Sequence, residues 1–325
     1  MNKKQYAVVI TSKQNAELLP VCDIMPLAED EVRGRTLCTL ISAGTELSWA
    51  YSGNTFPSYP GYSAVFVVEE VGTAVKDVKI GDRLFCQGSH RSFQQESIAK
   101  CVPVPSTLAS EKALFARMMG ISMTTLATTA AKPPETVVVT GLGPVGLMAA
   151  LTFQACGYDV IGCEPEKQRR QWANNAGLHT LYERIPTDDQ AIIGKVGLVV
   201  ECSGHESAVL DACKVIRKRG EIVLVGVPWR RRTEYYAHEL LSLVFHKYAV
   251  LRSGWEWELP LHTSDFHPHS IFGNYVAAIK WLSEARINVT GLFAEVSPSD
   301  AQSVYQGLLN NITASLCVVF NWESI

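Results

Sequence analysis

A glycine-rich turn between an apolar strand and an apolar helix limits the possible folds of this chain more than any other feature. Residues 137–140 favour a β-strand, and residues 147–156 favour a helix. Residues 159–163 favour a second strand, which is followed by the acidic residue Glu164. A strand, a helix and a second strand in this order predict a βαβ unit, in which the two strands belong to one parallel sheet.

The turn carries glycine at three positions with the spacing of a dinucleotide-binding turn. Gly141 allows a tight bend, Gly143 lets the backbone approach a pyrophosphate, and Gly146 allows close packing of helix and strand. Together with Pro144 and Val145, these glycines place free N–H groups and the positive end of a helix dipole where phosphate would bind. The alternative interpretation is a glycine turn in an ordinary βαβ unit.

The acid at the end of the second strand bears on the choice of dinucleotide. Glu164 follows the glycine turn by about 20 residues, the spacing at which a carboxylate contacts the ribose hydroxyls. Because a carboxylate would repel a 2′-phosphate, Glu164 favours NAD over NADP. Lys167, Arg169 and Arg170 follow closely and weaken that preference, although we expect them to be solvated residues of the next helix. We therefore predict NAD, with NADP as the alternative.

Two later strand-like segments end in small residues. Ligands of open α/β sheets bind at the carboxyl ends of the strands. We therefore expect contacts with the nicotinamide end of the cofactor from Cys202, Ser203, Gly226 and Val227. Ordinary strand-end turns are the alternative explanation for these residues.

Composition narrows the class of protein. The chain has 325 residues, is 47% hydrophobic and 19% charged, and has a net charge of −3, so two globular domains are possible and a nucleic-acid-binding surface is not expected. No apolar run reaches the 18 residues of a membrane span, and the N-terminal apolar run is too short for a signal peptide. The nine cysteines are scattered, which predicts reduced cytoplasmic thiols. We expect a cytoplasmic protein with a small-molecule substrate.

The chain divides into three parts by pattern. Residues 1–116 contain short strand-like segments broken by glycine and proline, which predict a mostly antiparallel β domain. In residues 117–255 strands and helices alternate, which predicts a doubly wound parallel sheet. We expect residues 256–325 to return and complete the first domain.

Several short segments together resemble the medium-chain dehydrogenase/reductase superfamily, which has the architecture of the zinc alcohol dehydrogenases. These segments, beside the glycine turn, are Ala43-Gly44-Thr45-Glu46, Pro60-Gly61-Tyr62-Ser63, Gly81-Asp82-Arg83 and Glu201-Cys202-Ser203-Gly204. The resemblance covers essentially the whole chain. It implies an α/β fold with a GroES-like, mostly-β catalytic domain and a Rossmann domain, and it implies a homodimer or homotetramer. Residues 41–46, 59–62 and 318–322 look most similar to threonine-dehydrogenase-like proteins and bacteriochlorophyllide hydroxyethyl dehydrogenase.

The zinc ligands that the resemblance implies are missing. Ala43 stands where the zinc members carry cysteine, and Tyr62 stands where they carry histidine. The third ligand would fall at residues 117–120, which contain no Cys, Asp or Glu. Catalytic zinc needs three protein ligands, alanine offers no donor atom, and a neutral phenol is a poor ligand. We therefore predict no metal site and no zinc.

Without a metal, side chains would have to handle the proton. Tyr62 could hydrogen-bond a carbonyl oxygen and transfer a proton, and Thr45 matches the hydroxyl that relays the substrate proton in the superfamily. His90 could reach the cleft from its loop. The alternatives are that Tyr62 fills the vacated metal pocket, that Thr45 is a turn hydroxyl, and that His90 has no role. For Glu46 we expect an ion pair with an arginine.

These observations predict a zinc-independent, NAD(P)-dependent oxidoreductase of class EC 1.1.1.-. It would move a hydride between the nicotinamide and the carbinol carbon of a secondary alcohol, such as a polyol, a sugar derivative or another hydroxylated ring. An enone or quinone reductase of the same fold is one alternative. A non-catalytic dinucleotide-binding protein is another. No partner other than a small molecule and further copies of the chain is expected, and neither a membrane nor a nucleic acid.

Overall fold

The computed structural model describes residues 4–22 and 25–325 and divides into two compact units. Unit 1 consists of Met1–Arg117 and Val289–Ile325, so it is built from two separate parts of the chain. Unit 2 is Met118–Asn288. The first domain is therefore completed by the C-terminal part of the chain, but the return begins at Val289 and not at residue 256.

Helix α8 explains the later return point. It spans Ile271–Ser283 and packs on α3, which spans Ala116–Thr128. A Cβ atom on Gly120 would lie 2.4 Å from Cε1 of Tyr275, so the absence of a side chain at Gly120 permits this packing. Because the buried face of α8 lies on α3, residues 256–288 belong to the second unit.

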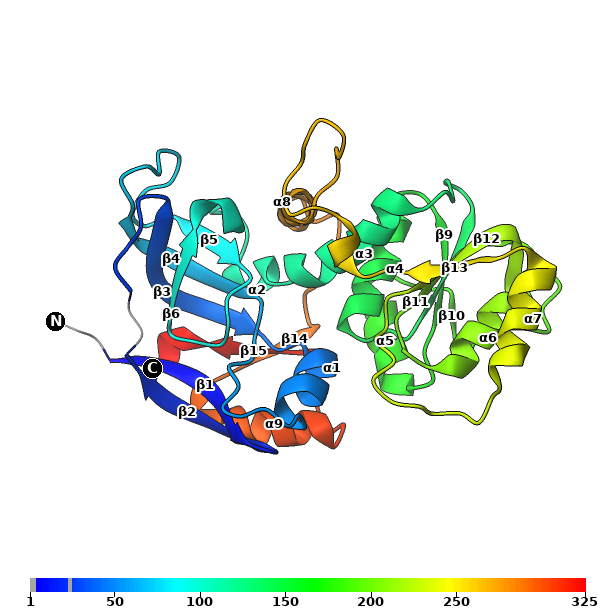
Figure 1. Cartoon of the computed structure of the whole chain (residues 1–325), viewed down its shortest axis with the longest axis horizontal. Helices are drawn as coiled ribbons and strands as arrows, with labels where there is room; N and C mark the ends of the chain where they lie inside the picture. The colour runs from blue at the N-terminus through cyan, green and yellow to red at the C-terminus, as the bar shows by residue number, and fades with distance from the viewer. Residues whose placement is uncertain (1–3, 23–24) are drawn as a thin grey trace. The chain divides into compact units, whose positions relative to one another are not determined.

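Unit 1 contains a mostly antiparallel seven-stranded sheet and a separate two-stranded sheet (Figure 1). The larger sheet has the order β14-β15-β3-β4-β5-β7, and β6 also pairs with β3. The strands of unit 1 are β1 (Gln5–Ser12), β2 (Asn15–Val21), β3 (Glu31–Leu40), β4 (Ala64–Val71), β5 (Arg83–Cys86), β6 (Phe93–Ser97), β7 (Cys101–Pro103), β14 (Phe293–Val296) and β15 (Cys317–Asn321). The C-terminal strand β15 pairs with β3, which joins the two separate parts of the unit.

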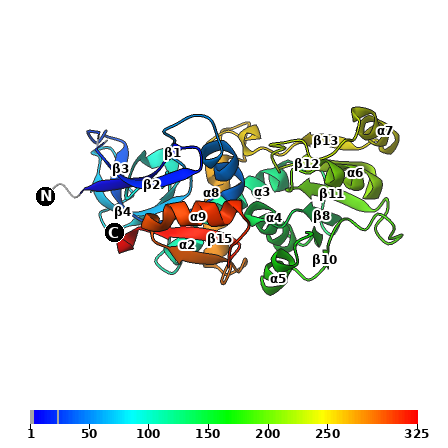
Figure 2. The ribbon, with the colours of Figure 1, turned by 90° about the horizontal axis from the view of Figure 1, so that it is seen from below.

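The helices of unit 1 are short and come from both parts of its chain. They are α1 (Ala43–Thr45), α2 (Ser110–Ala113) and α9 (Ala301–Leu309). A π-helical turn, Glu46–Tyr51, continues directly from α1. Figure 2 shows α9 alongside β2, and the two elements are in contact. Helix α9 also contacts the π-helical turn that follows α1, so side chains from both parts of the chain meet at the candidate site described below.

Unit 2 is a doubly wound sheet of six parallel strands in the order β10-β9-β8-β11-β12-β13. Its strands are β8 (Thr136–Thr140), β9 (Asp159–Cys163), β10 (Leu181–Tyr182), β11 (Val196–Glu201), β12 (Ile216–Leu224) and β13 (Val250–Ser253). Its remaining helices are α4 (Pro144–Ala155), α5 (Lys167–Asn175), α6 (Glu206–Val215) and α7 (Ala237–Lys247). The chain runs outward from β8 to β10 on one side and from β11 to β13 on the other, so the winding reverses between β8 and β11.

Some predicted elements differ from the observed ones. The sequence pattern of residues 111–129 favours one helix, but this stretch is broken into α2 and α3. The pattern of residues 96–103 favours one strand, but β6 and β7 lie there, separated by a 3₁₀ turn, Ile98–Lys100. Strands β2, β10 and β14 have only a weak signal in the local sequence, because β10 and β14 are short and β2 is only partly buried. Within residues 4–22 and 25–325, no helix combines the length and the apolar character that crossing a bilayer requires.

Candidate active site

The glycine turn follows β8 directly and lies at the carboxyl edge of the parallel sheet, beside the point where the winding reverses. Gly141 has a φ angle of +76°, which is unfavourable for other residues, and a Cβ atom there would lie 2.8 Å from Cα of Ser203. A Cβ atom on Gly146 would lie 1.8 Å from the carbonyl oxygen of Gly141. Both glycines are therefore needed for the turn to form.

Gly143 differs from these two glycines. It is the N-cap of α4, and Pro144 is the first residue of that helix. A Cβ atom on Gly143 would meet only one atom within 4 Å, Nη1 of Arg169 at 3.8 Å. The space above Gly143 is thus open to a ligand at a helix N-terminus, where the N–H groups and the helix dipole favour an anion. These residues fit a pyrophosphate.

The loops that follow β11 and β12 lie against the glycine turn. The N–H group of Cys202 donates to the carbonyl oxygen of Thr140, at 2.8 Å. A Cβ atom on Gly226 would lie 2.4 Å from the nitrogen of Gly204, and one on Gly204 would lie 2.6 Å from the carbonyl oxygen of Val227. The residues predicted to contact the nicotinamide end, which also include Ser203, are therefore together at the carboxyl edge of the sheet.

Glu164 lies beside the turn, at the end of β9, but its carboxylate is mostly covered. Its side chain is 5% exposed. Its Oε2 accepts from the N–H group of Leu142 at 2.8 Å, and its Oε1 accepts from that of Glu166 at 3.0 Å. Nη1 of Arg169 lies 3.9 Å from Oε2, whereas Arg170 donates to the carbonyl oxygen of Glu164 and has a structural role. Arg169 is thus the cation nearest to the predicted ribose site.

In unit 1, Tyr62 lies two residues before β4, and its hydroxyl group donates to Oγ of Ser42. Thr45 also hydrogen-bonds the phenol, and Cζ of Arg117 lies 4.8 Å from the centre of its ring. Burial raises the pKa of Tyr62 above its usual value near 10, and the neighbouring Glu46 raises that pKa further. The bonds to Ser42 and Thr45 and the charge of Arg117 act in the opposite direction. At neutral pH the phenol therefore keeps its proton and can donate it.

Behind Tyr62 lies a buried carboxylate. The side chain of Glu46 is 1% exposed. Its Oε1 accepts from the N–H group of Ser42 at 2.7 Å. Its Oε2 accepts from Nε2 of His90 at 3.0 Å and from the hydroxyl of Tyr305, on α9, at 2.5 Å. The expected ion pair with an arginine was wrong, because the carboxylate points into the unit and three donors from the interior satisfy it.

His90 is fully buried, and both of its ring nitrogens have partners. Nδ1 lies 2.8 Å from Oγ1 of Thr39, which also accepts from Nε1 of Trp322. Because the Thr39 oxygen accepts from the indole, we infer that its own proton points to Nδ1, so that Nε2 carries the proton given to Glu46. The expectation that His90 reaches a substrate does not agree with this geometry. His90 instead orients Glu46.

Sequence reasoning missed three residues that the structure brings to these sites: Ser42, Arg117 and Tyr305. Ser42 lies within residues 41–46, and Arg117 lies within residues 117–120, where a third zinc ligand would fall. Both could have been found by asking which polar neighbours accompany the motif. Tyr305 is 259 residues away from Glu46, so no local signal connects the two.

At the positions where the zinc members bind their metal, the side chains of this protein do not offer a set of donor atoms that fits zinc. Ala43 has no donor atom, the phenol of Tyr62 is hydrogen-bonded to Ser42, and Arg117 brings a positive charge. Over residues 4–22 and 25–325, no three His, Cys, Asp or Glu side chains gather closely enough to hold a metal ion. Whether the protein in solution carries zinc stays a prediction.

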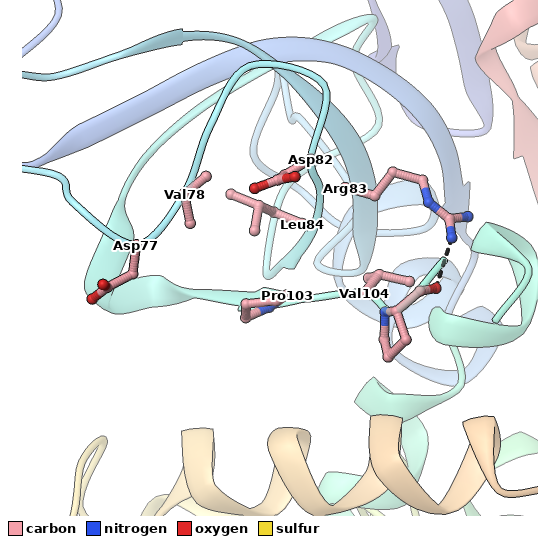
Figure 3. A pocket seen from close by; sticks show the side chains of 8 residues that line it. Asp77, Val78, Asp82, Arg83, Leu84, Pro103 and Val104 are labelled. Atoms are coloured by element: carbon pink, nitrogen blue, oxygen red, sulfur yellow. Dashed lines mark hydrogen bonds between the residues drawn. The ribbon is translucent and has the colours of Figure 1, made fainter. Parts of the chain in front are cut away.

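Two cavities lie apart from the residues described above. One cavity, of about 240 Å³, lies in unit 1, and the residues that line it include Asp77, Leu84 and Pro103 (Figure 3). Beside it, the guanidinium group of Arg83 donates to the carbonyl oxygen of Pro105. The other, of about 340 Å³, is lined in unit 2 by residues at the amino ends of β8, β9 and β11. No predicted site residue lines either cavity.

Comparisons with known proteins show similarity to dehydrogenases. Residues 144–255 match the family described as zinc-binding dehydrogenase. An alcohol dehydrogenase from Geobacillus stearothermophilus is 26% identical over 210 residues, which cover 53% of this chain and 62% of that protein. A sorbitol dehydrogenase from Macaca fascicularis is 24% identical over 211 residues, which cover 53% of this chain and 59% of that protein. The matched segment thus spans less than two thirds of the length of either relative.

A solved structure extends the likeness to the whole fold. A proposed zinc-binding dehydrogenase from Sinorhizobium meliloti 1021, bound to NADP, superposes with a TM-score of 0.78 at 16% identity. The superposition covers 98% of this chain and 100% of that one. This likeness confirms the predicted fold class, a GroES-like β domain with a doubly wound Rossmann domain.

Proposed function

Because this chain belongs to the medium-chain dehydrogenase/reductase superfamily, we propose that it is a nicotinamide-dependent oxidoreductase that acts without zinc. It transfers a hydride between NAD(H) and a secondary alcohol or the corresponding ketone. The observation that carries the proposal is the group formed by Tyr62, Ser42 and Thr45, which puts hydroxyl groups where the zinc members have metal ligands.

The cofactor proposal rests on the carboxyl edge of the parallel sheet. The open backbone at Gly143, the N-terminus of α4 and the close loops after β11 and β12 fit an extended dinucleotide. Glu164 favours NAD, since its carboxylate lies beside the glycine turn at the end of β9, where the ribose would bind, and Arg169 beside it leaves NADP as the alternative. When bound, the nicotinamide supplies or accepts the hydride.

The proton is handled by the protein. Tyr62 donates a proton to the carbonyl oxygen of the ketone, and its raised pKa keeps that proton available at neutral pH. Ser42 and Thr45 hold the phenol, and Arg117 lies over its ring, so the oxygen of Tyr62 has a defined position.

The substrate class follows from the same hydroxyl groups. They suit a hydroxylated substrate, and we propose a polyol, a sugar derivative or another hydroxylated ring. The similarity to a sorbitol dehydrogenase supports a polyol. We also propose a homodimer or homotetramer, with no macromolecular partner other than the chain itself. The closer placement among threonine-dehydrogenase-like proteins stays a prediction.

The test is turnover with ketoses and ring ketones, with NADH and with NADPH, together with a metal analysis of the purified protein. Tyr62→Phe should lower kcat/KM for ketone reduction by about 10²- to 10⁴-fold, the range for loss of a general acid. The matched control is Tyr59→Phe, because Tyr59 is a nearby tyrosine whose side chain is 47% exposed. Stoichiometric zinc in active protein would overturn the metal-free mechanism.

Two other results would favour the alternatives. Reduction of enones or quinones that does not depend on Tyr62 would identify a reductase of the same fold. NADH binding without turnover across the whole panel would identify a non-catalytic dinucleotide-binding protein.

A further inference from the structure

A second buried carboxylate, Glu201, lies at the carboxyl end of β11 and has no part in the mechanism above. The residue is 1% exposed, although a charged group is costly to bury. Burial raises the pKa of Glu201 above its usual value, and hydrogen bonds to its oxygens oppose that rise. Because a buried aliphatic side chain often fills such a position at lower cost, the hydrogen bonds that the carboxylate accepts point to its role.

The carboxylate of Glu201 accepts hydrogen bonds from the Ser203–Gly204 turn and from the end of β8. Its Oε1 accepts from the N–H groups of Ser203 at 2.7 Å and Gly204 at 3.1 Å, and also from the hydroxyl of Ser203. The hydroxyl of Thr140, the last residue of β8, donates to the same oxygen at 3.2 Å. Because backbone N–H groups can only donate, the arrangement is that of an acceptor, and it holds the Ser203–Gly204 turn against the end of β8.

The backbone of Glu201 extends this connection to β12. Its carbonyl oxygen accepts from the N–H groups of Val225 at 2.8 Å and Gly226 at 2.7 Å. Gly204, with a φ angle of +63°, then lies so close to Val227 that no side chain would fit between them. One residue thus joins the ends of β8, β11 and β12 into a single block.

These loops are on the nicotinamide side of the proposed cofactor site. In a doubly wound sheet the dinucleotide lies across the point where the winding reverses, and the pyrophosphate lies at the turn after the first strand, here β8. The acid that contacts the adenosine ribose, here Glu164, follows β9, on one side of β8. The nicotinamide end must then lie on the other side, over the loops after β11 and β12.

We propose that Glu201 is a positioning residue for the nicotinamide half of the cofactor. It holds the turn formed by Ser203 and Gly204, and through this turn it shapes the surface that contacts the nicotinamide. The adenosine half of the site, at β9, does not depend on it. This inference rests on the proposed function, since it assumes that the site takes a nicotinamide dinucleotide.

The test compares two ligands that differ in the nicotinamide ring. NADH contains the ring, whereas ADP-ribose has the adenosine, the pyrophosphate and the second ribose without it. Glu201→Ala removes the acceptor, and we expect NADH to bind about tenfold more weakly, the effect of losing charge-assisted hydrogen bonds, with ADP-ribose binding changed less than about twofold. Glu201→Gln keeps one oxygen but loses the charge, so an intermediate change in the same ratio is expected.

Isothermal titration calorimetry measures both dissociation constants in the full-length protein. Glu221→Gln is the matched control, because Glu221 is another buried carboxylate on the neighbouring strand β12, where it pairs with Arg252 and accepts from the N–H group of Ala130, not from the loops after β11 and β12. That variant should leave the ratio of the NADH and ADP-ribose dissociation constants unchanged.

Three outcomes would overturn the inference. Equal weakening of both ligands would mean that Glu201 supports the site as a whole, and unchanged dissociation constants for both ligands would mean that it has no positioning role. If unaltered protein bound ADP-ribose but not NADH, or neither ligand, the proposed function itself would fail. If Glu201→Ala did not fold, the ratio of the NADH and ADP-ribose dissociation constants in Glu201→Gln alone would test the inference.

Discussion

Gly143 and Gly146 belong to the same turn but meet different requirements. Gly143→Ala places a Cβ atom in open space at a negative φ, so the free energy of unfolding should stay within about 1 kcal/mol of the original. The same methyl group would occupy the place of a pyrophosphate, so NADH binding should weaken about tenfold or more. Urea denaturation and calorimetry would measure the two effects separately.

The contrasting variant is Gly146→Ala. Its Cβ atom would lie 1.8 Å from the carbonyl oxygen of Gly141, so the protein itself should lose stability, by about 1–3 kcal/mol. If Gly143→Ala were the less stable variant, or if it bound NADH normally, the assignment of the phosphate site would be wrong.

Glu46 should contribute to stability through its three hydrogen bonds. In Glu46→Gln the amide NH₂ group would face one of the donors from Ser42, His90 or Tyr305, and a buried donor would lose its acceptor. The free energy of unfolding should fall by about 1–3 kcal/mol, measured by urea denaturation. Glu69→Gln is the control, because Glu69 is half-exposed and should change stability by less than about 0.5 kcal/mol.

The protonation state of Tyr62 predicts how kcat/KM for ketone reduction depends on pH. A raised pKa means that the phenol stays neutral past its usual value near 10, so proton donation should persist through neutral pH. We expect kcat/KM for ketone reduction to hold up to about pH 10 and to fall above it as the phenol ionises. The alkaline fall should be absent from the residual activity of Tyr62→Phe. A fall near neutral pH would assign the proton to another group.

At the scale of elements, several strands carry thiols whose pKa is raised by burial. The pKa of Cys101, on β7, and that of Cys163, on β9, are each raised to about 12, from 9.0. In the unfolded chain a thiol ionises near pH 9, whereas in the folded protein it stays neutral until about pH 12. The stability that comes from the neutral buried thiol is thus complete below pH 9 and is lost as the pH rises toward 12.

We therefore expect the urea midpoint of unfolding to decrease from pH 9 to pH 10.5. Each such thiol contributes a slope of about 1.4 kcal/mol per pH unit in this range. Cys163→Ala should have a smaller slope than the unaltered protein, although it starts from a lower stability. A midpoint that is independent of pH up to 10.5 would show that these thiols are not buried as neutral groups.

Elements with a strong local signal were predicted well. Strand β9 and the glycine turn before α4 match the expectation closely, because a continuous apolar run and obligatory glycines specify them locally. Residues 96–103 were predicted less well, since β6 and β7 pair with different strands and a turn must join them. Pairing partners at long sequence separation were decisive there, and the local pattern does not contain them.

At the scale of the whole molecule, the sheet of unit 2 ends at β13, and large apolar side chains are exposed near that edge. Helix α7 has no buried residue. The exposed side chains in residues 229–250 are Trp229, Tyr235, Tyr236, Leu241, Phe245, Tyr248 and Val250. An edge strand offers unpaired backbone groups, and apolar side chains at such an edge mark an association surface.

We expect a second copy of the chain to cover this surface, because an edge strand can pair antiparallel with itself about a twofold axis. The protein should be a dimer or a larger even assembly by multi-angle light scattering. Phe245→Glu, at a side chain that is 76% exposed, should shift it toward the monomer. Ile80→Glu is the control, since Ile80 is similarly exposed but lies on unit 1. A monomeric unaltered protein would contradict the prediction.

The sequence alone determined the parts of this protein that depend on local geometry. Three glycines at fixed spacing between a strand and a helix specify the glycine turn, and the residue types at positions 43 and 62 predict that two zinc ligands are missing. The tertiary structure decided which polar groups meet. His90 became a buried partner of Glu46, Tyr305 came from α9 to the same carboxylate, and Glu201 joined three strand ends. These contacts connect residues far apart in the chain, and their geometry exists only once the sheets have formed, so no local pattern of residues could have specified them.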